Sequence, residues 1–299
     1  MKRILVTGAS GFLGKRLVLE LIEKNNEVFT TDLKPLALNG VVKHFQGNLA
    51  SKPILDGLSN LSIDSVVHLS AQTGVIQSIQ VPLNDLQSNV VSTISLLEIL
   101  PNMGCRNFIY GQSGGSIYSR EADLPANESA LISPESPYGI SKWMGEIYVK
   151  YFCEKHSISW SSLAFSNLYG PVNDNSKGVI YEFSKRMSNQ EPIEIFGSKL
   201  TRDYLYLSDA IRALEFALDK PTNRRINIAS GIETSTYEIF SALLKYYPGY
   251  RIPPKILPSR KGEVLRSCLD NALARELLSW NPEIPILEGL RMALGLRGN

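Results

Sequence analysis

The sequence predicts an α/β protein with a doubly wound parallel sheet and a smaller C-terminal α/β subdomain. Three observations lead to this class. An apolar run near the N-terminus passes through closely spaced glycines into a helical pattern. Strand-like apolar runs then alternate with helical stretches to about residue 170, and beyond it short elements follow in irregular order. Regular alternation of strands and helices is typical of a parallel sheet with helices on both faces.

The first strand, helix and second strand are expected at residues 4–6, 12–24 and 27–32. The turn between the first strand and the helix contains Gly8, Gly11 and Gly14. Such glycines permit a tight turn and let the backbone approach a diphosphate, while the helix N-terminus offers free N–H groups. With the acid Asp32 eighteen residues after Gly14, the pattern predicts a Rossmann-type dinucleotide site.

Asp32 indicates which dinucleotide is bound. A carboxylate at the end of the second strand accepts hydrogen bonds from the adenosine ribose and repels a 2′-phosphate, so NAD is favoured. Lys34, two residues on, partly offsets that repulsion and leaves NADP as the alternative.

The alternation continues through four further stretches. Residues 41–49 and 64–72 are apolar runs that end in small polar residues, and His68 is expected to end a core strand. Residues 82–100 predict one helix, and residues 106–115 another strand. The apolar side of that helix is expected to carry Leu86, Val90, Ile94 and Leu97.

A further helix, expected over residues 136–156, carries Tyr138 and Lys142 near its start. The spacing of four puts both side chains on one face, at the carboxyl edge of the sheet where a nicotinamide would lie. A phenol has a pKa of about 10, and a nearby ammonium or an oxidised nicotinamide favours the phenolate. Tyr138 is therefore expected to take a proton from a sugar hydroxyl, with Lys142 lowering its pKa and binding the nicotinamide ribose.

Four motifs carry a family resemblance: "TGASGFLG", "YGISK", "SNLYGP" and "RDYLYLSD". In this order they resemble the extended short-chain dehydrogenases/reductases that act on nucleotide sugars, most of all the UDP-glucose 4-epimerases. The resemblance implies a catalytic pair, Tyr138 and Lys142. It also implies NAD contacts from both of these and from Gly8, Gly11, Phe12, Leu13, Gly14, Asp32, Asn48, Leu49, Leu69, Ala71, Gln72 and Asn89.

The chain departs from the family pattern at two positions. Asn48 stands where the family usually has an aspartate, and its amide can still hydrogen-bond adenine. Gly114 stands where a Ser or Thr usually assists the reacting hydroxyl. Ser113 is our first candidate for that role and Ser116 the second, unless both hydroxyls only satisfy loop backbone. The run Gly114-Gly115-Ser116 also lacks the acid pair of the family's 4,6-dehydratases, which disfavours elimination chemistry.

The chain is expected to form an NAD-binding domain over residues 1–170 and a substrate-binding subdomain over residues 171–299, re-crossing near 205–230. An apolar strand containing Ile193, Ile195 and Phe196 can flank a base, and the fork of Arg202 suits diphosphate oxygens. The resemblance implies a substrate site made of Asn167, Val179, Ile195, Phe196, Arg202, Arg260 and Glu263.

Composition excludes several other classes. The formal charge of +2 over 299 residues is spread along the chain, so no nucleic-acid partner is expected. No apolar run approaches the roughly 20 residues that span a bilayer. The three scattered cysteines and three histidines do not have the spacing of metal ligands, so no metal is expected. Scattered cysteines also lead us to expect a protein with reduced thiols in the cytoplasm. A homodimer is expected.

Three functions remain open on the sequence. The first is an NAD-dependent epimerase that inverts C4 of a UDP-hexose through a 4-keto sugar and regenerates its cofactor. The second is a nucleotide-sugar 4-reductase or dehydrogenase, which releases its cofactor changed. The third, suggested by Gly114, is an NAD-binding protein without catalysis.

Overall fold

The computed structural model describes residues 1–172, 178–197, 200–258 and 264–296, and the chain divides into two compact units. Unit 1 comprises Met1–Ile117, Pro134–Ala164 and Ile211–Ile226. Unit 2 comprises Tyr118–Ser133, Phe165–Ala210 and Asn227–Asn299.

The units differ in detail from the expected division at residue 170. Unit 2 resumes at Phe165 and includes residues 118–133, which had been expected in the first domain. The backbone of Ala126 explains this grouping, because its N–H donates to the carbonyl of Cys268 (2.9 Å) and its carbonyl accepts from the N–H of Asp270 (2.9 Å). The chain returns to unit 1 over Ile211–Ile226.

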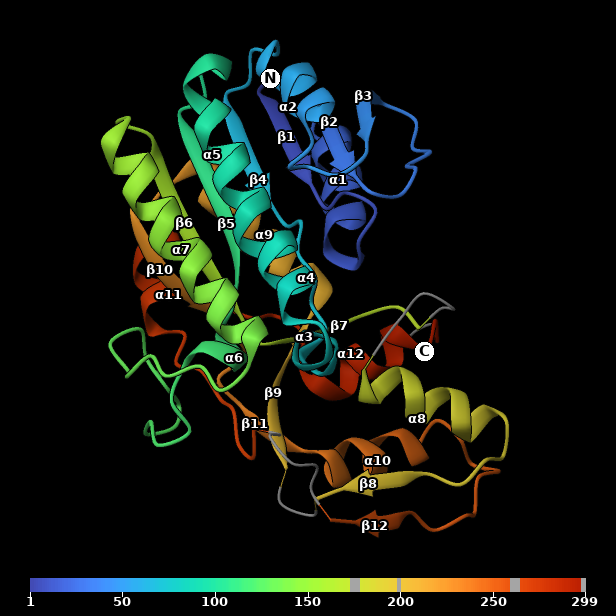
Figure 1. The fold of residues 1–299 in the computed structure, drawn as a ribbon. Helices are drawn as coiled ribbons and strands as arrows, with labels where there is room; N and C mark the ends of the chain where they lie inside the picture. The colour runs from blue at the N-terminus through green and yellow to red at the C-terminus, as the bar shows by residue number, and fades with distance from the viewer. Residues whose placement is uncertain (173–177, 198–199, 259–263, 297–299) are drawn as a thin grey trace. The chain divides into compact units, whose positions relative to one another are not determined.

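Unit 1 is built on a seven-stranded sheet with the order β10-β6-β5-β4-β1-β2-β3 (Figure 1). The pairings β1–β2, β1–β4, β2–β3 and β4–β5 are parallel. The strands are β1 (Arg3–Thr7), β2 (Glu27–Asp32), β3 (Val41–Gln46), β4 (Ser65–His68), β5 (Asn107–Ser113), β6 (Ser159–Phe165) and β10 (Arg224–Ile228). The doubly wound parallel sheet predicted from the sequence is confirmed.

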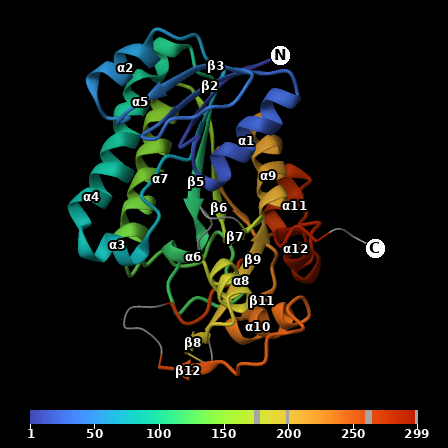
Figure 2. The ribbon, with the colours of Figure 1, turned by 90° about the vertical axis from the view of Figure 1, so that its right-hand side faces the viewer.

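Helices cover both faces of this sheet. In the side view, α5 and α7 lie on one face and α1 and α9 on the other (Figure 2). The helices of this part are α1 (Phe12–Glu23), α2 (Lys52–Ser59), α3 (Val75–Gln80), α4 (Pro82–Leu86), α5 (Ser92–Met103), α6 (Gly114–Ile117), α7 (Pro137–Lys155) and α9 (Leu207–Asp219).

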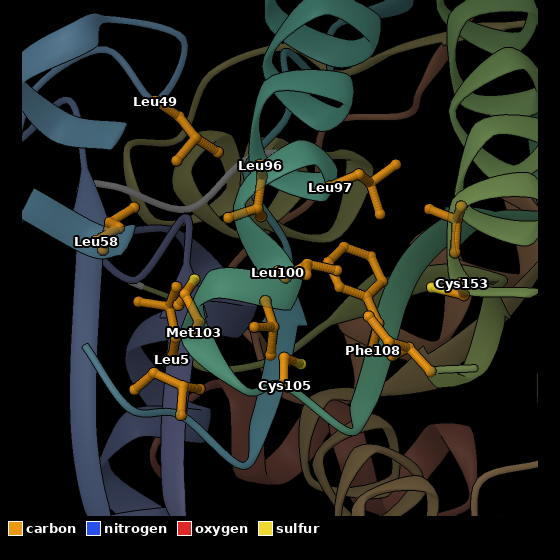
Figure 3. Close-up of a cluster of buried hydrophobic side chains, with 14 of the residues drawn as sticks. Leu5, Leu49, Leu58, Leu96, Leu97, Leu100, Met103, Cys105, Phe108 and Cys153 are labelled. Carbon is orange, nitrogen blue, oxygen red and sulfur yellow. The ribbon is translucent and has the colours of Figure 1, made fainter. Parts of the chain in front are cut away.

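The core of unit 1 lies between the sheet and helices α2, α5 and α7. Figure 3 shows side chains from strands and helices meeting there, among them Leu5, Leu58, Leu97, Phe108 and Cys153. Burial of a large apolar side chain stabilises a fold by about 1.5–3 kcal/mol. The cluster therefore fixes α5 and α7 against the central strands of the sheet.

The predicted helix over residues 82–100 differs from the observed one. The chain forms α4, then a π-helical segment, η1 (Gln87–Val91), and then α5. The wider turn shifts the helix face, so that Leu86 is exposed while Val90 and Leu97 are buried. It also buries the polar residue Asn89, and π-helical turns are often found at functional sites.

Unit 2 contains a three-stranded sheet, a two-stranded parallel sheet and four helices within its described residues. The first sheet has the order β11-β9-β7, and the second pairs β12 with β8. The strands are β7 (Asn167–Tyr169), β8 (Glu194–Phe196), β9 (Thr201–Tyr206), β11 (Glu233–Ser235) and β12 (Lys255–Leu257). The helices are α8 (Val179–Ser188), α10 (Thr236–Leu244), α11 (Ala272–Leu278) and α12 (Ile286–Ala293).

Two further features of the described residues concern membranes and metal ions. None of the helices found there is long and apolar enough to cross a membrane. In the same part of the chain, no three His, Cys, Asp or Glu side chains gather closely enough to hold a metal ion.

Candidate active site

The glycine turn lies where the order of the parallel strands reverses, between β1 and β4. Gly8 has a left-handed backbone (φ +66°), and a Cβ there would lie 2.7 Å from the backbone of Leu69 and Ser70 at the end of β4. A Cβ on Gly14 would collide with the Gly8 carbonyl oxygen. No side chain among the described residues caps α1 at Gly11, so its N–H groups remain for a phosphate. This cradle fits the diphosphate of a dinucleotide.

Asp32 joins the glycine turn to the end of β2. Its Oδ2 accepts a hydrogen bond from the N–H of Ser10 (2.9 Å), and its Oδ1 accepts from the N–H of Lys34 (2.9 Å). The carboxylate is thus held beside the phosphate cradle, where an adenosine ribose would place its hydroxyls.

The other expected NAD contacts are exposed to different degrees. Phe12 and Asn48 are exposed, and Leu13, Leu69, Ala71 and Gln72 are half-buried. Leu49 instead is buried in the core of unit 1, as Figure 3 shows. Its side chain supports the strand end and offers only backbone to a ligand.

Asn89 is buried and acts as a clamp. Its side-chain oxygen accepts from the N–H of Gln72 (2.7 Å), and its amide donates to the Gln72 carbonyl (3.0 Å) and to the Ser141 hydroxyl (3.0 Å). Protein groups already use this amide, and the expected contact of Asn89 with NAD stays a prediction.

Tyr138 lies in the first turn of α7, which begins at the N-cap Ser136. Its side chain is only 8% exposed. The Ser113 hydroxyl, at the end of β5, hydrogen-bonds the phenol. Ser116, the other serine considered, donates instead to the Ser113 carbonyl (3.3 Å). The structure thus brings Ser113 and Tyr138 together through strand β5 and helix α7.

The expected effect of Lys142 on Tyr138 differs from what the structure shows. Burial raises the pKa of Tyr138, and the group that opposes this is Ser113. Lys142 is 3% exposed, and burial lowers its own pKa to about 7. Its Nζ lies 4.0 Å from the centre of the Tyr110 ring. Desolvation by burial is thus the largest influence on the pKa of the Tyr138 phenol.

The expected substrate residues that are described lie in unit 2. Arg202 is half-buried in β9, Asn167 is exposed in β7, and Val179 begins α8. Ile195 is 1% exposed and belongs to the core of unit 2, whereas Phe196 is half-buried. Because the side chains of consecutive residues in a strand point to opposite faces, Phe196 and not Ile195 is able to flank a base. Arg260 and Glu263 lie outside the described residues.

Three buried polar residues near Tyr138 and Lys142 were missed by the sequence reasoning. They are Asp85, Gln112 and Glu146. Asp85 precedes Asn89 by four residues and Glu146 follows Lys142 by four, so helical spacing was the signal that could have found them. Gln112 donates to Glu146 (2.9 Å) and to the Lys142 carbonyl (3.0 Å).

Comparison with known proteins gives a consistent result. Residues 4–229 match the NAD dependent epimerase/dehydratase family. A putative UDP-glucose 4-epimerase of Methanocaldococcus jannaschii is 34% identical, over 99% of this chain and 98% of that protein. The UDP-glucose 4-epimerase of Mycolicibacterium smegmatis is 32% identical over 96% of each.

Solved structures are similar over nearly the whole chain. A UDP-glucose 4-epimerase of Thermotoga maritima with UDP-glucose superposes with a TM-score of 0.92 at 33% identity, over 97% of this chain and 96% of that one. A Thermus thermophilus UDP-glucose 4-epimerase in complex with NAD gives 0.87 at 27% identity, over 97% of each.

Proposed function

The chain belongs to the NAD dependent epimerase/dehydratase family, and on that basis we propose that it inverts C4 of a UDP-hexose. Its cofactor is NAD, as the position of Asp32 predicted. The family resemblance of the sequence motifs is confirmed by the same findings. Relatives named UDP-glucose 4-epimerase support the choice of nucleotide and sugar.

The observation that carries the proposal is the contact between Ser113 and Tyr138. The Ser113 hydroxyl reaches a buried phenol at the carboxyl edge of the sheet, where the two groups can share a sugar hydroxyl. Bound in its oxidised form, NAD supplies a hydride acceptor and a positive charge that favours the Tyr138 phenolate.

In the proposed reaction, Tyr138 Oη takes the proton of the C4 hydroxyl and later returns it. Ser113 orients that hydroxyl, and Lys142 holds its proton at Nζ. The sugar turns over as a 4-keto intermediate before C4 is reduced on its other face. We assign cofactor binding to unit 1 and UDP-sugar binding to unit 2, through Asn167, Phe196, Arg202 and the positions Arg260 and Glu263.

The test is to incubate the purified protein with UDP-, GDP-, CDP- and dTDP-hexoses and identify the products by NMR. We expect UDP-glucose and UDP-galactose to interconvert without net change at the nicotinamide absorbance band. Tyr138→Phe should lose several orders of magnitude in kcat while NAD binding stays nearly unchanged. Stoichiometric change of the nicotinamide would instead identify a reductase or dehydrogenase.

We further propose a homodimer formed through α7. Ile140, Ile147 and Tyr151 are exposed at spacings of seven and four residues, so they form one apolar stripe along this helix. A second copy of the same stripe would bury it. Light scattering should show that Ile147→Glu gives a monomer. Ile256→Glu, at an isoleucine equally exposed (48%) in unit 2, should leave the dimer intact.

We place the protein in the cytoplasm, because Cys105, Cys153 and Cys268 are all free and buried. Reduced cysteines are typical of that compartment. Fractionation of the source cells tests the assignment, and recovery of the protein outside the cytoplasm would contradict it.

A further inference from the structure

Lys142 is a buried cation with two buried carboxyl groups acting on it. Burial lowers the pKa of Lys142 to about 7, while the charges of Glu146 and Asp85 oppose that lowering. The remaining titratable groups around it are His68, Tyr110 and Tyr138. Burial holds the pKa of His68 at about 3 and raises the pKa of both phenols. Glu146 and Asp85 are therefore the groups that favour the charged form of Lys142 against its burial.

Glu146 already has other partners. Its Oε2 accepts hydrogen bonds from Gln112 (2.9 Å) and from the Ser162 hydroxyl (2.7 Å). Its Oε1 lies 3.4 Å from Nε of Arg225, whose side chain is 12% exposed. Glu146 thus interacts with the guanidinium of Arg225 as well as with the ammonium of Lys142. A substitution of Glu146 would therefore disturb the packing of α7 on β5 and β6.

Asp85 is held differently. Its Oδ1 accepts hydrogen bonds from two neutral amides, those of Gln72 (3.3 Å) and Asn89 (3.2 Å). The Ser141 hydroxyl and the charge of Lys142 lower the pKa of Asp85 against the larger effect of burial. A nearly inaccessible carboxylate next to neutral donors requires a compensating cation, and Lys142 is the cation that acts on it.

We propose that Asp85 is a positioning residue whose carboxylate, fixed by Gln72 and Asn89, keeps the Nζ of Lys142 protonated beside the reacting groups. Because Gln72 belongs to the loop after β4 and Asn89 holds that loop through its hydrogen bonds to Gln72, the carboxylate links the cofactor loop to α7. The catalytic meaning of this link rests on the proposed function, whereas the link itself does not.

The first test is an NMR titration of the NAD-loaded protein labelled with ¹³C- and ¹⁵N-lysine. Asp85→Asn keeps an oxygen for Gln72 and Asn89, removes the charge and replaces the second oxygen by a neutral NH2 group. We expect Lys142 to titrate about one pH unit lower, or more, in this variant than in the wild type. Asp56→Asn, at an exposed acid that pairs with Lys52, should leave the titration of Lys142 unchanged. Identical titration of Lys142 in wild type and Asp85→Asn would overturn the proposal.

A reciprocal measurement keeps the test independent of that variant's folding. Since coupling between two groups is mutual, Lys142→Met should raise the pKa of the Asp85 carboxyl, observed at its ¹³Cγ. An unchanged Asp85 titration would count against the proposal as well.

The pH profile of turnover completes the experiment. In Asp85→Asn the alkaline limb of kcat should move to lower pH with KM nearly unchanged, and Asp85→Glu should restore it partly. An equal loss of kcat at every pH would indicate a merely structural role. The titrations need no substrate, so a protein without epimerase activity would refute the proposed function and leave this inference standing.

Discussion

The family pattern places a Ser or Thr hydroxyl at the position of Gly114. In this chain the nearest hydroxyl is that of Ser113, one residue earlier. The strand end of β5 turns at once into the short helix α6, and the hydroxyl that meets Tyr138 is the one on the strand side of that turn. The motif alone left Ser113 and Ser116 as alternatives, because only the direction of the chain after β5 decides which one faces the phenol.

Ser113→Ala should therefore lower kcat at least tenfold with little change in KM. Loss of a hydrogen bond that strengthens in the transition state costs about 2.7–4 kcal/mol, or about 10² to 10³ in rate. Ser116→Ala is the matched control, since its hydroxyl donates to a backbone carbonyl, and should cost much less. Steady-state rates of both variants decide which serine assists the reaction. Full activity of Ser113→Ala beside an inactive Ser116→Ala would reverse the assignment.

Asp32 allows a second residue-scale prediction, on cofactor choice. Asp32→Asn keeps one acceptor oxygen for the backbone of the glycine turn but removes the charge that repels a 2′-phosphate. NAD should bind more weakly to this variant, and the preference for NAD over NADP should become smaller. Calorimetric titration with both dinucleotides measures the two affinities. If the unmodified protein bound NADP more tightly than NAD, the role of Asp32 would be refuted.

At the scale of elements, α7 contacts β5 too closely to admit a side chain at Gly145. A Cβ there would collide with the hydroxyl of Tyr110, which donates to the Lys142 carbonyl (3.2 Å). The two contacts fix α7, and with it Tyr138 and Lys142, at one height along β5. Such a contact between distant residues leaves no trace in the helical periodicity of the sequence.

Gly145→Ala should destabilise the protein although alanine is the better helix former. Overpacking a core costs about 1–3 kcal/mol, which exceeds the gain of about 1 kcal/mol in helix propensity. Tyr110→Phe removes the colliding oxygen, so the double variant should be more stable than the sum of the two single effects predicts. Urea denaturation measures all three free energies of unfolding. Strict additivity would show that this contact does not set the position of α7.

At the scale of the whole molecule, the sequence predicted what local patterns encode. The glycine turn, Asp32 and the alternation of strands and helices need only neighbouring residues to be recognised, and the fold follows from them. The π-helical turn at Asn89, the grouping of residues 118–133 with unit 2 and the raised pKa of Tyr138 depend on contacts between distant segments. These features lie beyond periodicity and spacing.

The tautomer of His68 also depends on contacts between distant segments, because a chain of hydrogen bonds fixes it. The Thr93 hydroxyl donates to the Asn89 carbonyl (2.6 Å), so it must accept from Nε2 of His68 (2.9 Å). Nδ1 then accepts from the Thr7 hydroxyl (2.7 Å), whose oxygen already accepts from the N–H groups of Leu69 and Ser70. A second ring proton has no acceptor there, and burial lowers the pKa of His68 to about 3.

This network makes the stability of the fold sensitive to acid. The pKa of His68 is lower in the folded chain than in the unfolded one, so its contribution to stability is complete above pH about 6.5 and is lost as pH falls toward about 3. Each pH unit in that window costs about 1.4 kcal/mol, hence about 3 kcal/mol between pH 6.5 and 4.5.

His68→Gln removes the titrating ring, so it should be less stable than the wild type near neutral pH. The difference in free energy of unfolding should then narrow by about 3 kcal/mol at pH about 4.5. Urea denaturation at both pH values measures it, with His156→Gln, at an exposed histidine, as the matched control. A difference that stays constant between the two pH values would mean that His68 can take up a proton in the folded chain, and that the hydrogen-bond chain from Thr7 to Asn89 does not fix its tautomer.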